Sequence, residues 1–596
     1  MSGRSVLGIS AGYHDAAAAV VVDGELRAAA QEERFSRRKH DPSMPLEAAQ
    51  WCLDHAAVDQ PDLVVFYDKP FTTYERLVST HASVGPRGFP QLARAVRTWA
   101  QGKLWVQSAV DRLLADVGRR PTRLLYAEHH VSHAAAAFYP SPFERAAVLT
   151  VDGVGEWATT TTGVGVGGNL HLAQQLNFPD SVGLLYSTFT AYCGFAVNDG
   201  EYKLMGLAPY GEPRFLPLLR EHVVEVAPDG AVRLDQRYFD YRAGHRMASP
   251  QLEALLGVPP RRASEALTQA HADLAASVQE LTESIVLDMA RDLHRRTGEQ
   301  NLCLGGGVAL NCVANARVLD EGPFDDVWVQ PAAGDAGSAV GAALWAHHAV
   351  EGHDRVAQQP DGMSGAALGP AFDPAAVRQW LVGAGVEVVD FESDAERNDF
   401  AAQALDDGAV VGWCSGPMEF GPRALGHRSI LADPRNPSMV QRINQKVKGR
   451  EGFRPFAPAV LAEHADTWFE MDRPSPYMLR TVQVRSFEPQ VVGGADFSTR
   501  LAGVRSPLPA CTHVDGSARV QTVDQRTLPH FWGLIEAFRI RTGCPVVLNT
   551  SFNRADEPIV RTPSDALRCA VAAQLDLLVF DRCAVRGSTL QSLTTR

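Results

Sequence analysis

The feature that most constrains the fold is a strand-and-turn pattern that occurs twice in the first half of the chain. Residues 6–33 read as an apolar strand, a turn of small residues, a second apolar strand, an Asp-Gly turn and a third strand. Residues 146–175 follow the same plan, with Asp152 and Gly153 at the end of the first strand. Because helical stretches follow each unit, the pattern predicts a duplicated α/β domain with its ligand between the two halves.

The length of the chain predicts more than one domain. Its 596 residues exceed the usual size of a single domain. Residues 350–374 mix Gly, Pro, Gln and Ser with charges, and this loose composition predicts a domain boundary. The segments that follow read as helix and strand in alternation: a helix at 375–383, a strand at 385–391, a further helix, and strands at 409–416, 518–523 and 545–553. The expected α/β domains are residues 1–355 and 365–596.

Charge, cysteine content and hydropathy limit the class of protein. A net charge of −13 argues against a general nucleic-acid binder. The nine cysteines include no C-x-x-C pair, and their odd number is typical of reduced, buried thiols. The N-terminal residues lack the apolar core of a signal peptide, and no stretch has the roughly 20 apolar residues of a membrane span. We therefore expect a cytoplasmic protein that binds neither nucleic acid nor membrane.

A candidate metal site combines two histidines with two aspartates. His129 and His133 occur in an alanine-rich helical stretch at the i,i+4 spacing at which two imidazoles share a metal, whereas His130 points away. Asp152 and Asp335 each follow an apolar strand and are flanked by glycine. Such a donor set suits Fe²⁺, Mn²⁺ or Zn²⁺. The alternative is a pair of partly exposed helix histidines and two turn aspartates.

A glycine-rich loop at residues 304–311, LGGGVALN, follows a strand and opens a helix. Backbone N–H groups in such a loop often face a phosphate, although any tight strand-to-helix turn uses similar glycines. The loop matches neither a Walker A nor a Rossmann fingerprint.

Arginines and lysines in the second half are set among Gly, Pro and apolar residues. Residues 416–435 read GPMEFGPRALGHRSILADPR, and residues 444–461 read NQKVKGREGFRPFAPAVL. Forked guanidiniums beside polar strand ends suit bidentate binding of phosphate or carbamoyl oxygens. In an acidic protein such a cluster predicts an anionic small molecule. The alternative is a set of ion pairs with Glu419, Asp433 and Glu451, which explains one or two of the arginines.

These motifs resemble those of one family, the O-carbamoyltransferases of the nodulation and antibiotic-tailoring type. The resemblance spans nearly the whole chain, and the two arginine-rich motifs are long enough to be highly specific. The motifs, in the order of the family, are GYHDAAAAVV, EHHVSHAAAAF, DGVGEWAT, EYKLMGLAPYG, GGGVALN, MEFGPRALGHRSILADPR, FRPFAPAVL and NTSFN.

The resemblance implies a fold and a reaction. It implies an N-terminal domain of duplicated actin-like (ASKHA, Kae1-like) α/β fold, and a YrdC-like α/β C-terminal domain. The second domain would form carbamoyl-adenylate from carbamoyl phosphate and Mg-ATP, with release of pyrophosphate. The first domain would then transfer the carbamoyl group to a hydroxyl of a small molecule, of which a secondary metabolite with a sugar or polyketide hydroxyl is the expected class.

The resemblance also implies a role for each motif. His14 would be the base that acts on the acceptor hydroxyl. The metal ligands would be His129, His133, Asp152 and Asp335, with Fe²⁺ as the first expectation and Mn²⁺ or Zn²⁺ as alternatives. The carbamoyl phosphate and ATP site would use Arg423, Lys448, Arg454, Arg519 and Asn549, with Arg428 and Asn553 in second rank. A nucleotide site of the first domain, for AMP or a separate ATP, would use Gly305, Gly306, Gly307 and Asn311.

Two other readings share parts of this pattern. A tRNA threonylcarbamoyl-type transferase would have the same first domain, but it should present a basic tRNA-binding face, which the net charge disfavours. A non-enzymatic actin-like scaffold would bind ATP without carbamoyl chemistry, and the motifs FRPFAP and NTSFN argue against it. A homodimer is the expectation from base rates alone.

Overall fold

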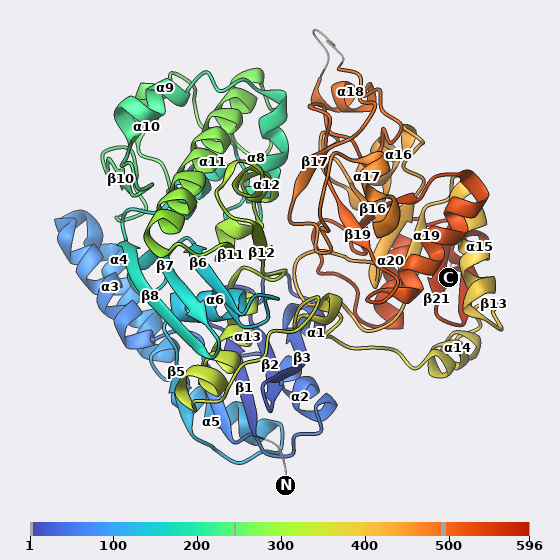
Figure 1. The fold of residues 1–596 in the computed structure, drawn as a ribbon, viewed down its shortest axis with the longest axis horizontal. Coiled ribbons are helices and arrows are strands. Elements are labelled where there is room, and N and C mark those ends of the chain that lie inside the picture. The colour runs from blue at the N-terminus through green and yellow to red at the C-terminus, as the bar shows by residue number, and fades with distance from the viewer. Residues whose placement is uncertain (1–3, 244–245, 490–495, 595–596) are drawn as a thin grey trace. The chain divides into compact units, whose positions relative to one another are not determined.

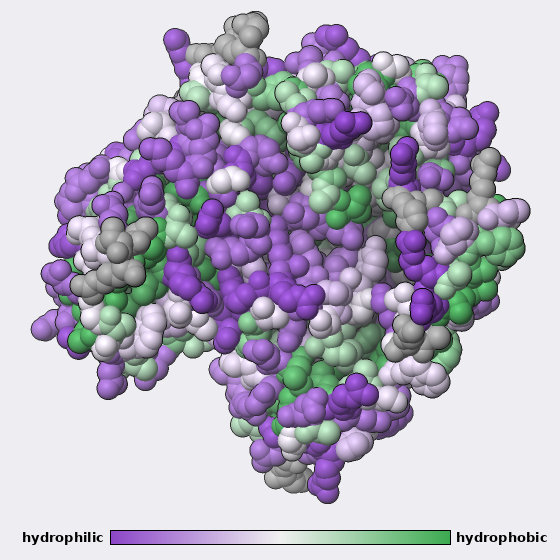
Figure 2. Space-filling model, turned by 180° about the vertical axis from the view of Figure 1, so that it is seen from behind, coloured by the Kyte–Doolittle hydropathy of each residue, from purple (hydrophilic) through white to green (hydrophobic). Residues whose placement is uncertain are grey.

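A computed structural model describes residues 4–243, 246–489 and 496–594. The chain forms two compact units, each α/β with mixed sheets (Figure 1). Unit 1 contains residues 1–32 and 40–362, and unit 2 contains residues 33–39 and 363–596. On the face that Figure 2 shows, hydrophilic residues predominate and apolar residues form separate patches. Among the described residues, no helix is long and apolar enough to cross a membrane.

Unit 1 contains two five-stranded sheets of the same topology. In each sheet the first strand in sequence is central, and it pairs antiparallel with the second, which pairs antiparallel with the third. On its other side the first strand pairs parallel with the fourth, which pairs parallel with the fifth. The strands of sheet 1 are β1 (Ser5–Ser10), β2 (Ala17–Val22), β3 (Glu25–Gln31), β4 (Leu63–Phe66) and β5 (Leu124–Tyr126). Those of sheet 2 are β6 (Arg145–Val151), β7 (Ala158–Val166), β8 (Asn169–Asn177), β11 (Asn301–Gly305) and β12 (Asp326–Val329). The identical strand order confirms the predicted duplication.

Two helices join the halves of unit 1. Helix α6 (His129–Phe138) follows β5 but packs on β6, β7 and β11 of sheet 2. Helix α13 (Asp335–Trp345) follows β12 but packs on β1, β2 and β4 of sheet 1, and it also packs against α6. Small side chains allow this close approach, because a Cβ added at Gly341 of α13 would lie 1.8 Å from the Ser132 carbonyl oxygen of α6. The N-termini of both helices therefore lie between the two sheets.

Of the other helices of unit 1, α2 packs on sheet 1, and α11 and α12 pack on sheet 2. Helix α11 is the longest of them and packs against α7, α12 and β6. The bounds are α2 (Leu46–His55), α3 (Pro70–Ser83), α4 (Phe89–Thr98), α5 (Val106–Asp116), α7 (Val182–Tyr192), α8 (Glu201–Leu207), α9 (Leu216–Leu218), α10 (Pro250–Leu256), α11 (Gln269–Thr297) and α12 (Cys312–Glu321). A short hairpin is formed by β9 (Val224–Val226) and β10 (Val232–Leu234).

Unit 2 is built on an eight-stranded mixed sheet of order β13-β22-β21-β14-β15-β20-β16-β19. Its strands are β13 (Val389–Asp390), β14 (Val411–Cys414), β15 (Arg428–Ala432), β16 (Ala457–Leu461), β19 (Gln521–Val523), β20 (Val546–Ser551), β21 (Leu577–Phe580) and β22 (Cys583–Arg586). A two-stranded sheet holds β17 (Thr481–Gln483) and β18 (Ser517–Arg519). The helices are α1 (Glu33–Ser36), α14 (Pro374–Gly383), α15 (Asp394–Asp406), α16 (Ser438–Gln441), α17 (Ala465–Trp468), α18 (Phe497–Ala502), α19 (Pro529–Thr542), α20 (Pro563–Ala572) and α21 (Gly587–Thr594).

The predicted elements of unit 2 are present with two differences. The helix at 375–383 and the strands at 409–416 and 545–553 correspond to α14, β14 and β20. The strand predicted at 385–391 is reduced to the two-residue edge strand β13. The strand predicted at 518–523 is divided at Val520, where the chain passes from the small sheet into the large one. Pattern alone did not show this change of sheet, because each half pairs with a strand that is distant in sequence.

Candidate functional site

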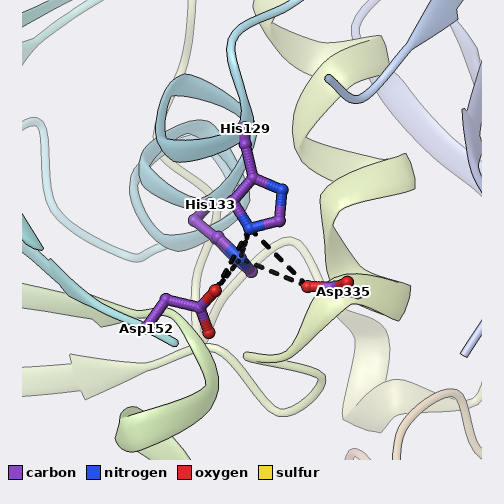
Figure 3. A group of neighbouring side chains, drawn as sticks. All are labelled: His129, His133, Asp152 and Asp335. Carbon is purple, nitrogen blue, oxygen red and sulfur yellow. Dashed lines mark hydrogen bonds and ion pairs between the residues drawn. The ribbon is translucent and has the colours of Figure 1, made fainter. Parts of the chain in front are cut away.

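The structure brings the two histidines and two aspartates of the first half together in unit 1. His129 and His133 lie on the first turns of α6, Asp335 is the first residue of α13, and Asp152 follows the last residue of β6. Figure 3 shows the four side chains pointing toward one another. One ligand atom from each lies within 4.8 Å of the others. The site therefore forms where the two helix N-termini meet the central strand of sheet 2.

The distances between the donor atoms fit a shared ion. The Nε2 atoms of His129 and His133 are 3.0 Å apart, and His129 Nε2 lies 3.2 Å from Asp152 Oδ2. Asp335 Oδ1 lies 3.7 Å from His129 Nε2 and 3.6 Å from His133 Nε2. Ligand atoms about 2.1 Å from one ion stand roughly 3.0–3.4 Å apart, depending on the coordination angle. The observed separations are close to that range.

The charge of the two carboxylates also favours a bound cation. The side chains of His129, His133 and Asp335 are nearly fully buried, and Asp335 Oδ2 is buried without a hydrogen-bond partner. Burial opposes a charge on His129, but the hydrogen bond to Asp152 and the charge of Asp335 outweigh it and raise the pKa of His129 to about 10. The carboxylates thus hold a proton at the position that a divalent ion would take. Two imidazoles and two carboxylates suit Fe²⁺, Mn²⁺ or Zn²⁺.

Neighbouring groups orient the four side chains. The backbone N–H of Gly307 donates to Asp152 Oδ1 at 2.8 Å. Ser338 Oγ lies 3.2 Å from His133 Nδ1, which leaves Nε2 directed at the other donors. The backbone N–H of His129 donates to the carboxylate of Glu156, with distances of 3.0 and 3.2 Å to its two oxygens. Such contacts fix the tautomer and rotamer of metal ligands.

His130 is not part of the group. Its Nδ1 lies 2.7 Å from Thr150 Oγ1, and burial together with the charge of His129 lowers the pKa of His130 to about 3. A neutral imidazole on the sheet side of α6 is a packing residue. This agrees with the helical spacing, which turned His130 away from His129 and His133.

His14 lies beside this group, in the turn between β1 and β2. Its Nε2 is 3.8 Å from Asp335 Oδ2, and its Nδ1 is 2.9 Å from Asp15 Oδ2. Asp15 Oδ1 in turn lies 2.7 Å from His40 Nδ1, and His40 Nε2 lies 3.2 Å from Asp199 Oδ1. Two carboxylates and two imidazoles thus alternate in a chain that ends at His14 Nε2.

The electrostatics of His14 depend on the neighbouring carboxylates. Burial alone would lower its pKa, but the charge of Asp335 and the hydrogen bond and charge of Asp15 raise the pKa of His14 to about 9. A divalent ion beside Asp335 would offset that carboxylate and favour the neutral imidazole. Only the neutral form accepts a proton.

The glycine-rich loop has a structural role in this site. Gly305 ends β11, and Gly306 has a φ of +86°, with its added Cβ 2.3 Å from the Val151 carbonyl oxygen. Gly307 bonds Asp152 as described above. Asn311 is the N-cap of α12, where its Oδ1 accepts from Ala314 N at 3.1 Å. These contacts explain the three glycines and Asn311 by their role in the fold, with no nucleotide needed. A nucleotide site in the first domain remains a proposal.

In unit 2, the structure groups three predicted residues at the end of β20. Lys448 Nζ donates to the carbonyl oxygen and Oγ of Ser551, and to the carbonyl oxygen and Oδ1 of Asn553 at 3.0 and 2.9 Å. Burial, together with the nearby charge of Arg450, lowers the pKa of Lys448 well below its usual range. Asn549, two residues before Ser551, donates from Nδ2 to Gln521 Oε1 at 2.9 Å and to the Ala424 carbonyl at 3.2 Å. Asn549 therefore ties β20 to the loop that carries Arg423.

The arginines of unit 2 differ in what they contact. Arg428 is fully buried, and its guanidinium donates to the carbonyl oxygens of Gly416 and His427 at 3.0 and 2.9 Å and to that of Pro370 at 3.0 Å. It therefore holds the loop between β14 and β15 in shape, and its contact with a ligand remains a proposal. Arg454 lies 3.6 Å from Glu451, the ion pair weighed as an alternative.

Arg423 and Arg519 are half-buried. Arg423 lies in the loop between β14 and β15, and Arg519 ends β18. Arg454 is half-buried as well, so partial exposure is common to these three arginines.

Two family models cover the chain. The model described as the carbamoyltransferase N-terminus matches residues 5–344, and the model described as the carbamoyltransferase C-terminus matches residues 402–587. The chain belongs to the carbamoyltransferase family. It is thus an enzyme that transfers a carbamoyl group, and this confirms the family indicated by the motifs.

Relatives of this carbamoyltransferase come from several bacteria. An uncharacterized protein of Synechocystis sp. is 48% identical over 590 residues, which cover 97% of this chain and 95% of that one. The nodulation protein NolNO of Sinorhizobium fredii is 39% identical over 588 residues, which cover 97% of this chain and 79% of that one. The 3'-hydroxymethylcephem-O-carbamoyltransferase of Amycolatopsis lactamdurans is 31% identical over 417 residues, 67% of each chain.

Sequence reasoning missed several residues that shape these sites. Asp15 and His40 orient His14, Glu156 holds the N-terminus of α6, and Gln521 holds Asn549. Asp15 directly follows His14, so an acidic neighbour beside a candidate base was a usable signal. The others are 25 or more residues away from their partners, and no local pattern marks them.

Proposed function

We propose that this carbamoyltransferase is ATP-dependent and acts on a hydroxyl of a small molecule. Unit 2 would form carbamoyl-adenylate from carbamoyl phosphate and Mg-ATP, and unit 1 would transfer the carbamoyl group to the acceptor. The observation that carries the proposal is the buried group of His129, His133, Asp152 and Asp335 with His14 beside it, in a chain of this family. The relative named as an O-carbamoyltransferase supports an alcohol as acceptor.

The first half-reaction follows from atom balance. Pyrophosphate leaves ATP only if an oxygen nucleophile attacks the α-phosphorus. Carbamoyl phosphate would therefore first lose its phosphate to water, and the oxygen of the resulting carbamate would attack. The bond between the α-phosphorus and the bridging oxygen breaks, which gives carbamoyl-adenylate and pyrophosphate.

In unit 2, cationic side chains would stabilise the phosphate charge of this step. Arg423, Arg454 and Arg519 would contact phosphate oxygens, because forked guanidiniums match them bidentately. Loss of one such donor commonly costs about 10²–10³ in rate. Lys448, Asn549 and Asn553 would form the floor of the site, since their contacts tie β20 to the adjacent loops.

The second half-reaction needs an activated hydroxyl. His14 would accept the hydroxyl proton at Nε2, because Asp15 occupies Nδ1. The hydroxyl oxygen then bonds to the carbamoyl carbon, and AMP leaves. The residues that would hold a metal ion are His129, His133, Asp152 and Asp335, and such an ion supplies Lewis-acid stabilisation of the oxygen that gains charge. Fe²⁺ is the first expectation, with Mn²⁺ and Zn²⁺ as alternatives.

The fold assignments belong to the same proposal. The repeated strand order of unit 1 supports an actin-like domain of the Kae1 type. A YrdC-like identity of unit 2, a nucleotide bound by Gly305, Gly306, Gly307 and Asn311, and a secondary metabolite as acceptor are further parts of it.

Exchange of labelled pyrophosphate into ATP tests the first half-reaction without an acceptor. We expect exchange that requires carbamoyl phosphate. The variants Arg423→Ala and Arg519→Ala should lower its rate by about 10²-fold or more, as expected for lost phosphate ligands. His14→Ala should retain exchange, because the base acts only in the second half-reaction.

The outcome that would count against the proposal is also defined. ATP binding without exchange, both alone and with a panel of hydroxylated acceptors, would remove the adenylate step. Transfer of the carbamoyl group would then have to proceed without an adenylate.

A further inference from the structure

We propose that residues 33–39 position the loops of unit 2 that bind ATP and carbamoyl phosphate, with Arg34 and Arg37 as the positioning residues. This inference rests on the proposed adenylate-forming function of unit 2. The segment reads ERFSRRK and begins with the short helix α1. The segment follows β3 of unit 1 in the sequence, yet it packs in unit 2. The rest of unit 2 begins only at Met363.

Arg34 holds the turn that precedes Arg423. Its side chain is buried, and its Nη2 donates to the carbonyl oxygen of Gly421 at 2.9 Å. The carboxylate of Glu33 lies 2.9 Å from its Nη1 and compensates the buried charge. Gly421 has a φ of +124°, which residues with a side chain rarely adopt. The turn therefore depends on glycine at this position. A buried guanidinium on that carbonyl fixes the direction in which the chain continues toward Arg423.

Arg37 holds the loop that follows Asn553. Its Nη1 donates to the Ile559 carbonyl at 2.6 Å, and its Nη2 donates to the Pro558 carbonyl at 2.7 Å. Two neighbouring carbonyls match the planar fork of a guanidinium, which a lysine ammonium does not reproduce. Lys39 adds a bond from Nζ to the Ala555 carbonyl at 3.3 Å.

This loop in turn supports Lys448 and the two residues that it contacts, Ser551 and Asn553, here called the Lys448 group. Asn553 Nδ2 donates to the Glu557 carbonyl at 2.7 Å, so the start of the loop is tied to its middle. The backbone N–H of Ala555 donates to the Lys448 carbonyl at 3.1 Å. The contacts of Arg37 therefore reach the side chains around Lys448 through two further hydrogen bonds. Loss of Arg37 would loosen the loop on which Asn553 depends.

A side chain of unit 2 also contacts residues 33–39. Arg561 Nε donates to the Arg34 carbonyl at 3.2 Å, and its guanidinium lies 4.4 Å from the centre of the Phe35 ring. Contacts thus run in both directions, from the segment to the loops and from the loop back to the segment. A reciprocal arrangement of this kind is typical of an integral part of a site.

The ends of the segment continue into the loop of unit 1 that carries His14. The Glu32 N–H donates to the Ala16 carbonyl at 2.8 Å, and the Ala16 N–H donates to the Asp41 carbonyl at 2.9 Å. One continuous stretch of backbone, residues 32–41, therefore supports the His14 loop in unit 1 and the phosphate-site loops in unit 2. No other stretch of the described chain alternates between the two units in this way.

Pyrophosphate exchange by the full-length chain tests this role with matched variants. The test variants are Arg34→Ala and Arg37→Ala, and the control is Arg38→Ala, which removes the same charge from an exposed neighbour. We expect kcat/KM for exchange to fall about 10- to 100-fold in the test variants, the effect of small misplacements of binding groups. The control should match the wild type. Arg37→Lys should recover only part of the loss.

A second readout separates positioning from misfolding. Hydrogen exchange followed by mass spectrometry should show lower protection at residues 553–561 in Arg37→Ala, with the protection of the central strands unchanged. Millimolar guanidinium should restore part of the exchange activity of Arg37→Ala, because the free cation can donate to the Pro558 and Ile559 carbonyls in place of the side chain. A loss of protection throughout unit 2 would instead mean a general folding role and would overturn the inference.

The failures of the two proposals are distinguishable. If the wild type exchanges and all three arginine variants behave alike, the role of residues 33–39 is wrong and the proposed function stands. If the wild type shows no exchange, the proposed function fails, and this inference fails with it.

Discussion

At the scale of single residues, the orientation of His14 depends on one carboxylate. Asp15 Oδ2 lies 2.9 Å from His14 Nδ1, which leaves Nε2 directed toward Asp335. We predict that Asp15→Asn lowers kcat for carbamoyl transfer at least about 10²-fold with little change in KM, because an amide favours the wrong imidazole tautomer, an effect that reaches about 10⁴ in a Ser-His-Asp triad. Steady-state kinetics of transfer, beside pyrophosphate exchange as an unaffected step, would measure it.

A matched control for this variant lies in the next turn of the same sheet. Asp23 also has a positive φ, 51° against 50° for Asp15, but it accepts a hydrogen bond from the Arg4 backbone instead of an imidazole. Asp23→Asn should leave transfer kinetics unchanged. Equal losses in both variants would point to the turn conformation and away from the tautomer of His14.

Glu32 makes the stability of unit 1 depend on pH. Burial raises the pKa of Glu32 to about 7, although the backbone N–H groups of Ala48 and Glu47 favour its charge. The folded state therefore holds this proton at pH values where the unfolded state has released it, so the stabilisation is present below the unfolded pKa and is lost as pH rises toward 7. Urea unfolding between about pH 5 and pH 8 should show the wild type losing stability relative to Glu32→Gln. A difference that is independent of pH would contradict the assignment.

Individual residues show what a sequence can reveal of a site. The spacing of His129 and His133 placed them on one helix face, and the structure has their Nε2 atoms 3.0 Å apart. Asp152 and Asp335 were found because each follows an apolar strand and is flanked by glycine. Nothing comparable marked His40, since its partner Asp15 is 25 residues away and the contact exists only after the chain has folded.

At the scale of elements, the packing of α6 on α13 sets the position of the candidate metal ligands. A Cβ at Gly341 would lie 1.8 Å from the Ser132 carbonyl oxygen and 2.6 Å from the Ala136 nitrogen, both in the backbone of α6. We predict that Gly341→Ala destabilises unit 1 by about 1–3 kcal/mol, as overpacking does. Because α6 must move, the variant should also bind metal more weakly. Thermal unfolding and metal titration would measure the two effects.

A second glycine provides the control for this variant. Gly206 lies inside helix α8, and a Cβ added there meets nothing within 4 Å. Gly206→Ala should be neutral or slightly stabilising, because alanine restricts the unfolded chain at no steric cost. Normal stability of Gly341→Ala would show that the helices separate without cost, and would remove the argument that their close packing positions the ligands.

Elements could be predicted where burial is periodic or continuous, and less well where a strand is short or changes partner. The strands at 6–33 and 146–175 were found from their apolar runs and turn residues, and their repetition gave the duplicated topology. The stretch ARVQTV at 518–523 was read as one short strand. Its division at Val520 is decided by pairing with β17 on one side and β16 on the other, which are long-range contacts.

At the scale of the whole molecule, the two proposed half-reactions use different units. The candidate metal ligands lie in unit 1, whereas the Lys448 group and Arg423 lie in unit 2. The chain is not divided at one point, because residues 33–39 pack with the later part of the sequence. The charged composition of this segment, ERFSRRK, is not the loose Gly- and Pro-containing composition of a boundary, so the sequence predicts only the single crossing near residue 362.

This division predicts that metal removal separates the two half-reactions. After treatment with a chelator and return of Mg²⁺ for ATP, pyrophosphate exchange should remain near its original rate, because the residues of unit 2 do not depend on the ion of unit 1. Carbamoyl transfer should be lost, and His129→Ala should reproduce this loss without any chelator. Addition of Fe²⁺, Mn²⁺ or Zn²⁺ singly should restore transfer, and the ion that restores the highest rate at the lowest concentration identifies the best match to two imidazoles and two carboxylates. Transfer that persists in protein shown by metal analysis to be metal-free would contradict the role of this group.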